Sequence, residues 1–420
     1  MERKVTDPGA PTLSEVLRAP SVVLYLLVSF SISAGTFMQA AALGKQVYDI
    51  TGREIDIGWI GLLEFAPAAL LVLVAGYVAD RFNRRVVASF ALAMEVFCAG
   101  ALFLYARHDQ TSVGPIFLIA LGFGIARAFM APALRAIPPL LAPPNGLPRV
   151  VALNSATWNF ALIFGPALSG MFYAIDAEWP YFVSMLIMAN GLVLLLFVRF
   201  TRVQDQSVSR ERASFSTAFE GLRFIRRTPI LFAAISLDLF AVLFGGAVAL
   251  LPVIAEERLG VGDVAYGWLR ASAGMGALVM GLLLVVVPLR RNIGRTLYMV
   301  VALFGLATIV LGLTHSYTVA FAAMFVLSAA DMVSVFIRAS LVPLVTPDEA
   351  RGRVNAVENV FIGASNELGA FESGTVSQAA GVPFTVVGGG IATIAVVAIF
   401  WFAFPVLRSI DRFEDIETEV

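Results

Sequence analysis

The chain has 420 residues and a formal net charge of −1, with 59% hydrophobic and only 14% charged residues. Soluble domains carry roughly 25% charged residues, and a water-soluble protein of this length could not bury so much apolar surface, so the composition predicts a membrane protein. The near-neutral charge excludes nucleic acid as a partner. One cysteine, Cys98, and two histidines, His108 and His315, exclude a disulfide framework and a thiolate or histidine-rich metal site.

The segment 1–20 contains three prolines, several charges and no apolar run, so we expect no cleavable signal peptide there. Apolar runs of about 20 residues, long enough to cross a bilayer as helices, recur along the rest of the chain. Six are predicted near 21–44, 56–79, 86–106, 113–137, 150–175 and 179–200. Six more follow a polar stretch, near 229–253, 265–289, 296–314, 317–345, 354–379 and 382–406.

These runs predict an all-α membrane protein with about twelve transmembrane helices. We expect a cytoplasmic segment over 1–20, one bundle over 21–200, a linker over 201–228, a second bundle over 229–406 and a tail over 407–420. With the N-terminus in the cytoplasm, most arginines fall on the cytoplasmic side, and the opposite side keeps Lys45, Arg53, Arg107, Arg258 and Arg270. This bias predicts a multi-pass protein of the cytoplasmic (inner) membrane with both termini in the cytoplasm.

The loop between the second and third predicted spans contains Gly76, Asp80, Arg81, Arg84 and Arg85 in the order G-x-x-x-D-R-x-x-R-R. This sequence resembles the loop signature of the major facilitator superfamily. Gly76 permits close helix approach, and Asp80 can stabilise the N-terminal end of a neighbouring helix, so we interpret these five residues as a conformational latch. The alternative is simple anchoring by Arg84 and Arg85 at the cytoplasmic face. The corresponding loop of the second half, 288–295, has no acid, so the latch is expected to be asymmetric.

Four other segments, 42–52, 127–138, 351–354 and 363–374, look like the enterobactin-exporter-like and drug:proton antiporter branch of that superfamily, although Lys45 and Arg135 depart from its pattern. The resemblance implies the major facilitator fold, with 12 transmembrane helices in two pseudo-symmetric six-helix bundles and a cavity lined by the first, fourth, seventh and tenth spans. It also implies proton-coupled movement of a small organic molecule, usually outward. Branch members are associated with siderophores, hydrophobic drugs and, in relatives, lysophospholipids.

The two halves also match each other in sequence. Arg149-Val150, Gly165 and Ser169-Gly170 recur 204 residues later as Arg353-Val354, Gly369 and Ser373-Gly374. Parallel repeats of this kind build transporters in which two halves rock around a central site. Between the halves, Phe215, Phe219, Leu222 and Ile225 have helical spacing and Arg223, Arg226 and Arg227 are interspersed, which predicts an amphipathic helix on the cytoplasmic membrane face. The alternative is a disordered linker.

Ionisable residues near mid-bilayer are costly and are therefore functional candidates. Arg127, Asp238 and Asp331 lie in the fourth, seventh and tenth spans, and Arg127 and Asp331 occupy equivalent positions of the repeat. Burial raises the pKa of a carboxyl and a nearby cation lowers it. Our hypothesis is that Asp331 and Asp238 carry the proton and that Arg127 holds down the pKa of a neighbouring carboxylate until a rearrangement. A static Arg–Asp pair that fixes helix register is the alternative.

Other acids could replace Asp238 in the proton route. Glu367 and Glu372 in the eleventh span are candidates, with helix packing as the alternative interpretation. Glu64 in the second span and Glu358 in the eleventh are further intramembrane acids, to which we assign no specific role. Glu95 in the third span, which is peripheral in the major facilitator fold, is interpreted as a structural hydrogen-bonding partner.

Four residues are candidate substrate contacts: Gln39, Trp158, Asn159 and Arg338. Arg338 lies seven residues after Asp331 on the same helix face and could bind an anionic group, pair with Asp331 or extend its charge to the membrane surface. Gln39 could instead bond neighbouring helices together. Trp158 could be an ordinary core or interface aromatic.

No nucleotide-binding motif and no nucleophile–base or metal-ligand constellation is recognisable, so we expect no enzyme, no cofactor and a proton gradient as the driving force. The sequence predicts a secondary active, proton-coupled exporter of a small amphipathic or hydrophobic molecule that works by alternating access. Two alternatives stay open: an uptake or lysophospholipid-flipping transporter of the same fold, and a non-transporting membrane scaffold or sensor. The expected partners are the substrate and the lipid bilayer, and the protein is expected to be a monomer.

Overall fold

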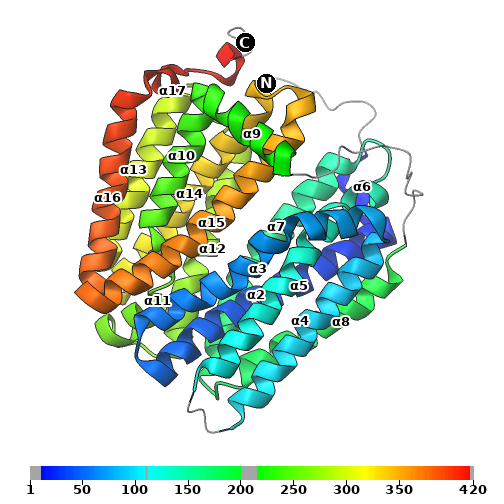
Figure 1. Ribbon diagram of the computed structural model, residues 1–420, viewed down its shortest axis with the longest axis vertical. Coiled ribbons are helices and arrows are strands. Elements are labelled where there is room, and N and C mark those ends of the chain that lie inside the picture. Colours follow the sequence, from blue (N-terminus) through cyan, green and yellow to red (C-terminus); the bar gives the residue numbers. More distant parts are fainter. Residues whose placement is uncertain (1–10, 109–111, 200–214, 417–420) are drawn as a thin grey trace.

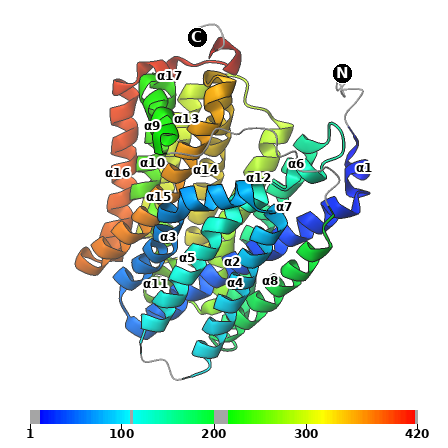
Figure 2. The same cartoon turned by 45° about the vertical axis from the view of Figure 1, so that its right-hand side comes forward.

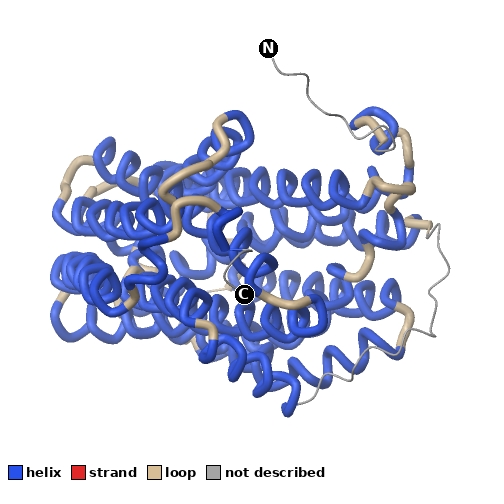
Figure 3. Tube along the Cα trace, turned by 90° about the horizontal axis from the view of Figure 1, so that it is seen from above, coloured by secondary structure: helices blue, strands red, loops and turns tan. Residues whose placement is uncertain are grey.

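The computed structural model describes residues 11–108, 112–199 and 215–416, and in these ranges the chain forms helices and loops (Figures 1 and 3). Two bundles follow one another in sequence. The first, blue to green in Figure 1, contains α1 (Leu13–Leu17), α2 (Pro20–Thr51), α3 (Glu54–Arg81), α4 (Arg84–Ala106), α5 (Gly114–Arg135), α6 (Pro138–Leu141), α7 (Leu147–Tyr173) and α8 (Trp179–Phe197).

The second bundle, green to red in Figure 1, begins after the linker helix α9 (Phe215–Arg227). It contains α10 (Pro229–Phe244), the short turns η1 (Gly246–Val248), α11 (Leu251–Val253) and η2 (Ile254–Arg258), and the long helices α12 (Asp263–Val286), α13 (Ile293–Leu313), α14 (Tyr317–Val345), α15 (Asp348–Ala380) and α16 (Val382–Ala403). Two short elements, α17 (Pro405–Ser409) and η3 (Phe413–Ile416), follow.

Within the described residues, ten helical segments are long and apolar enough to cross a membrane, and they coincide with ten of the predicted spans. The other two predicted spans correspond to α3, with 28 residues, and α15, with 33 residues. Both are long enough to cross a bilayer but carry several acids each. These two helices pack against each other between the bundles, where their acidic side chains avoid contact with lipid.

The seventh predicted span differs from the expected continuous helix. Regular α-helix ends at Gly245, and the chain continues through 3₁₀, α and π turns to Arg258. Gly246 lies against the backbone of Gly369. A Cβ placed on Gly246 would come within 2.7 Å of the Gly369 carbonyl carbon. A side chain at this position would collide with α15, so glycine permits the close contact but weakens the helix there.

Two seams join the bundles, one between α7 and α12 and the other between α3 and α15. In the first seam Gly170 and Gly267 face each other, and a Cβ on Gly267 would come within 2.8 Å of the Gly170 Cα. In the second seam Gly58 lies against Phe371, and a Cβ placed on Gly58 would come within 2.9 Å of the Phe371 Cα. Small residues therefore bring the helix backbones of the two bundles into direct contact.

Charged and polar contacts close one end of the interface. The Lys45 Nζ atom of α2 lies 2.9 Å from the Glu256 carboxylate and 3.8 Å from that of Asp263. The Tyr48 hydroxyl donates to Glu257, and the Tyr266 hydroxyl donates to the Ala41 carbonyl at 3.0 Å. We call this region, where α11 lies beside the end of α2 (Figures 1 and 2), the closed end.

The linker helix α9 is present, and it packs against α15 and α10 at the opposite end of the molecule (Figure 2). Ile225 is buried in the core of the second bundle, and Glu220 forms an ion pair with Arg353 of α15. The side chains of Phe215 and Phe219 lie outside the described part of the chain. The described apolar side chains of α9 therefore contact the second bundle, while Arg223, Arg226 and Arg227 are exposed.

Candidate transport site

Arg127 of α5 lies between two carboxylates of the first bundle. It forms an ion pair with Glu64 of α3, and its Nε atom lies 3.5 Å from the Glu95 carboxylate of α4. We call Glu64, Glu95 and Arg127 the Arg127 cluster. Gly124, one turn before Arg127, packs against the backbone of Glu64, leaving no room for a Cβ. This close approach of α5 to α3 brings the Arg127 side chain within reach of Glu64.

Glu95 is the most buried member of this cluster. Its side chain is 0% exposed, and neither carboxylate oxygen accepts a hydrogen bond. An isolated buried carboxylate without a donor costs several kcal/mol unless a cation or a proton neutralises it. Arg127 supplies the cation within ion-pair distance, but it shares its charge with Glu64.

Arg338 of α14 forms a second cluster, entirely within the second bundle. Its Nη2 atom lies 2.9 Å from the Asp238 carboxylate of α10, and its Nη1 atom lies 3.5 Å from that of Glu358 of α15. We call these three residues the Arg338 cluster. The side chains of Arg338 and Asp238 are 5% and 8% exposed, so the pair is nearly sealed from its surroundings.

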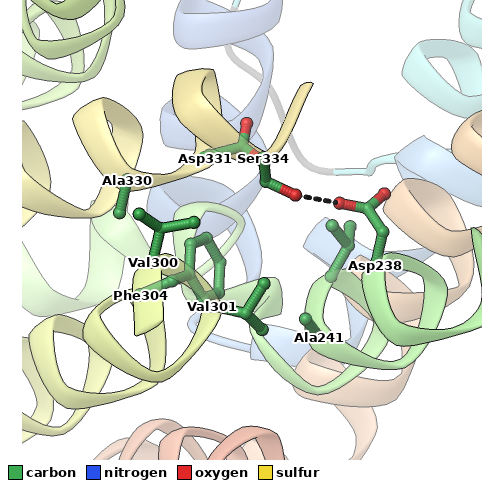
Figure 4. Close-up of a pocket in the computed structure, with 9 residues that line it drawn as sticks. Asp238, Ala241, Val300, Val301, Phe304, Ala330, Asp331 and Ser334 are labelled. Carbon is green, nitrogen blue, oxygen red and sulfur yellow. Dashed lines mark hydrogen bonds between the residues drawn. The ribbon is translucent and has the colours of Figure 1, made fainter. Parts of the chain in front are cut away.

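Asp331 lies beside the Arg338 cluster, because Asp331, Ser334 and Asp238 line the same small cavity of about 10 Å³ (Figure 4). The Ser334 hydroxyl donates to the Asp238 carboxylate at 3.4 Å, and Val300, Val301 and Phe304 form an apolar wall. A cavity of roughly 10–15 Å³ is large enough for about one water molecule.

The structure therefore brings Asp238 and Asp331 together, whereas Arg127 lies in another cluster. The neighbours of Arg127 are Glu64 and Glu95, and the arginine beside Asp238 is Arg338. Sequence reasoning interpreted Glu95 as a structural hydrogen-bonding partner and counted Glu358 among the intramembrane acids without a specific role. The signal for both was present, because each is an ionisable residue within a predicted span.

Glu367 and Glu372 occupy different environments on α15. The Glu367 carboxylate lies against Gly61 of α3, leaving no room for a Cβ, and interacts electrostatically with Glu64, Arg127 and Arg270. Glu372 accepts a hydrogen bond from the Ser373 hydroxyl at 3.4 Å. Of these two acids, Glu367 is the one that contacts the other bundle beside the Arg127 cluster.

The candidate substrate contacts differ in accessibility. Trp158 is 51% exposed, and its ring packs edge to face on Phe37 with 4.9 Å between centroids. The Asn159 amide donates to the Ser155 carbonyl at 3.0 Å. Gln39 is 2% exposed, and its amide nitrogen lies 3.8 Å from the Met188 sulfur. Trp158 is therefore accessible in this conformation, whereas Gln39 and Arg338 are buried.

The predicted latch residues make contacts inside the first bundle. Arg84 donates to the Ala136 carbonyl at 3.1 Å, Arg85 donates to the Val198 carbonyl at 3.3 Å, and Arg81 donates to the Tyr77 hydroxyl at 2.6 Å. Gly76 lies in the same helix as Arg81, and the side chain of Asp80 lies outside the described part of the chain. The arginines thus connect the start of α4 to the ends of α5 and α8.

No group of three or more His, Cys, Asp or Glu side chains within the described residues has the arrangement of a metal site. The functional geometry consists of two arginine–carboxylate clusters in a two-bundle helical protein. A family model described as Major Facilitator Superfamily matches residues 25–370. The chain belongs to this superfamily. It is therefore a multi-pass membrane protein, and the helical fold expected from the loop signature is confirmed.

Similar proteins of this superfamily include efflux proteins. Macrolide efflux protein A of Streptococcus pyogenes is 24% identical over 239 residues, which are 56% of this chain and 58% of that protein. This chain thus spans little more than half the length of that relative. The multidrug efflux pump Tap of Mycolicibacterium fortuitum is 24% identical over 427 residues, covering 95% of this chain and 99% of Tap.

Solved structures share the fold at lower identity. A POT family transporter in complex with 5-aminolevulinic acid superposes with a TM-score of 0.74 at 14% identity, covering 92% of this chain and 96% of that one. A bacterial homologue of the human lysosomal transporter Spinster, in an inward-facing and unoccupied conformation, gives a TM-score of 0.65 at 17% identity, covering 94% and 96% of the two chains. These likenesses concern the fold alone.

Proposed function

We propose that this transporter is a proton-coupled exporter of a small amphipathic or hydrophobic molecule across the cytoplasmic membrane. The observation that carries the proposal is the pair of arginine–carboxylate clusters in the interior of a major facilitator fold. The carboxylates of these clusters and the adjacent Asp331 can bind and release protons, and neither cluster is part of a nucleotide-binding motif. Similarity to efflux proteins supports the outward direction.

The arginine distribution supports an orientation with both termini in the cytoplasm. In that orientation the closed end, with Lys45 and Glu256, faces the outside. We expect substrate to bind from the cytoplasm or the inner leaflet, with the 51% exposed Trp158 as a candidate contact. We take the working unit to be a monomer, because each chain contains both bundles and both clusters.

The proton route of this proposal uses Asp238 and Asp331, with Arg127, Glu367 and Glu372 as further members. Asp238 and Asp331 line a cavity with room for about one water molecule, which could pass a proton between them. Arg338, bonded to Asp238, competes with a proton for that carboxylate. Movement of α14 relative to α10 would change this competition and release or capture the proton.

Everted membrane vesicles with an acidic lumen test the proposal. The probes are erythromycin, ethidium, enterobactin and lysophosphatidylethanolamine, and the control is the Asp331→Asn variant at matched expression. We expect at least one probe to accumulate in wild-type vesicles, and we expect a protonophore or the substitution to abolish this accumulation. Accumulation in right-side-out vesicles instead would indicate uptake. Accumulation that is independent of the proton gradient for every transported probe would contradict proton coupling.

A further inference from the structure

Two carboxylates from different bundles meet at the seam between α3 and α15. Glu64 belongs to α3 and Glu367 to α15. Gly61 lies one turn before Glu64 on the same face of α3, and the Glu367 carboxylate packs directly against it. The charges of Glu64 and Glu367 act on each other. The side chains of these two acids therefore share one part of the interface.

The charged groups around this pair do not balance it. Arg127 of α5 and Arg270 of α12 act on Glu367 as cations, and Arg127 also neutralises part of the charge of Glu64 and of Glu95 on α4. Arg270 additionally donates to the Tyr266 hydroxyl at 3.3 Å. Three carboxylates thus face two guanidinium groups, which leaves one negative charge in excess if all are ionised.

Glu95 provides a second and independent observation. This carboxylate is fully buried, points toward Arg127, and accepts no hydrogen bond on either oxygen. A polar group buried in this way needs a neutralising ligand. Arg127 lies 3.5 Å away but also pairs with Glu64, and the described residues contain no group arranged to hold a metal ion, so a proton is the ligand that remains.

We propose that Glu64, Glu95 and Glu367, grouped around Arg127, form a proton-binding site that spans the two bundles, and that its protonation stabilises the contact between α3 and α15. When both Glu64 and Glu367 are ionised, the two carboxylates repel each other across the seam. When Glu367 is protonated, this repulsion across the seam disappears. This inference rests on the proposed proton coupling and names where a proton changes the contact between the bundles.

The same site gives the direction of coupling. A proton captured from the outside would close the seam and favour the conformation seen here, in which Lys45 and Glu256 are paired at the closed end. Release of that proton to the cytoplasm would restore the repulsion and favour separation of α3 and α15. The Arg338 cluster cannot act in this way, because its three residues all belong to the second bundle.

Distance measurements between spin labels test this inference. The labels are placed at Arg53→Cys and Gln378→Cys, two exposed positions at the same end of α3 and α15, in a Cys98→Ala background. Double electron–electron resonance in nanodiscs is recorded from pH 5 to 9. In the wild type we expect the ratio of closed to open populations to rise as the pH falls, by up to ~10-fold per pH unit for one linked proton.

The test variant is Glu64→Gln/Glu367→Gln, whose amides carry no charge at any pH and so do not repel each other. We expect it to stay closed over the whole pH range, with the ratio changing by less than ~2-fold. Glu414→Gln, which removes an exposed carboxylate of η3 outside both clusters, is the matched control and should keep the wild-type titration. The single variants Glu64→Gln and Glu367→Gln, each expected to weaken the titration, serve if the double variant does not fold.

Two results would overturn the inference. One is a Glu64→Gln/Glu367→Gln variant whose closed-to-open ratio depends on pH as in the wild type, and the other is a wild type whose spin-label distances do not change with pH. The proposed function has a separate outcome. If wild-type transport is proton-driven while the double variant keeps its titration, only the location of the site is wrong. If wild-type transport ignores the proton gradient, the proposed function itself is wrong.

Discussion

Arg127 and Arg338 each lie between two carboxylates, but the two clusters differ in their relation to the bundle interface. The Arg127 cluster lies beside the seam and interacts with Glu367 of the other bundle, and the Arg127 side chain is 26% exposed. The Arg338 cluster is confined to one bundle, and the Arg338 side chain is 5% exposed. Similar chemistry therefore occurs in two settings, one of which changes when the bundles move and one of which is sealed.

This difference separates two uses of a buried ion pair. A sealed pair mainly fixes the positions of its helices, and breaking it leaves an uncompensated charge. A pair at a moving interface can exchange partners or protons as the bundles rock, so its free energy differs between conformations. We expect substitutions in the Arg338 cluster to affect stability most and substitutions around Arg127 to affect the conformational equilibrium most.

The largest effect is expected for Arg338→Ala. This change leaves Asp238 and Glu358 buried without their cation and should destabilise the folded protein by about 3 kcal/mol or more. Thermal unfolding in detergent measures the effect, with Arg226→Ala on the exposed face of α9 as the control. An unfolding temperature equal to that of the control would show that the pair contributes no stability.

A smaller effect distinguishes the carboxylates of the two clusters. Asp238 accepts hydrogen bonds from Arg338 and Ser334, so Asp238→Asn should cost about 2 kcal/mol. Glu95 accepts none, so Glu95→Gln should change the free energy of unfolding by less than ~1 kcal/mol. Equal losses for the two variants, measured side by side by denaturation, would remove the distinction between the clusters.

The Lys45→Ala variant tests the contacts of the closed end and leaves both arginine clusters unchanged. Its ammonium group joins α2 to Glu256 and Asp263 of the second bundle. Lys45→Ala should shift the equilibrium away from the closed conformation by about 1–2 kcal/mol, or roughly 5- to 30-fold in the population ratio. The spin-label pair at positions 53 and 378 reports this shift, and an unchanged distance distribution would argue against a gate role for Lys45.

The smallest effect on stability is expected for Asp411→Asn. Asp411 lies outside both clusters and outside the membrane-spanning helices. Its carboxylate accepts from the Asn292 backbone N–H at 2.9 Å and from Arg291, and these bonds lower its pKa below the usual value. A lowered pKa gives stability that is present above the unfolded-state value of about 3.9 and is lost as the pH falls through the folded value. Asp411→Asn should therefore unfold slightly earlier than the wild type at pH 7, with the difference vanishing at strongly acidic pH.

Hydropathy predicted the spans because lipid selects for apolar length, and the loop signature at Gly76–Arg85 indicated the family. The partners of the buried charges could not be predicted in the same way. The repeat places Arg127 and Asp331 at equivalent positions, but the pairing of Arg127 with Glu64 depends on the close approach of α5 to α3 at Gly124. Such contacts join residues far apart in the chain, and no local pattern encodes them.

The break after Gly245 was also missed, for a related reason. The span from Pro229 is apolar throughout, so composition predicts one helix. The interruption arises where Gly246 meets α15, and it depends on tertiary packing. The polar character of α15, by contrast, was visible in the sequence and made Glu367 a candidate.

Proton flux measured together with substrate flux tests the central claim most directly. Purified protein in liposomes that contain a pH-sensitive dye is given an imposed pH gradient and the first probe that the vesicle assay shows to be moved. The account predicts that substrate and protons move in opposite directions across the membrane in the wild type. In the Glu64→Gln/Glu367→Gln variant we expect neither substrate accumulation nor coupled proton movement. Substrate accumulation by that variant with normal proton countermovement would contradict the account.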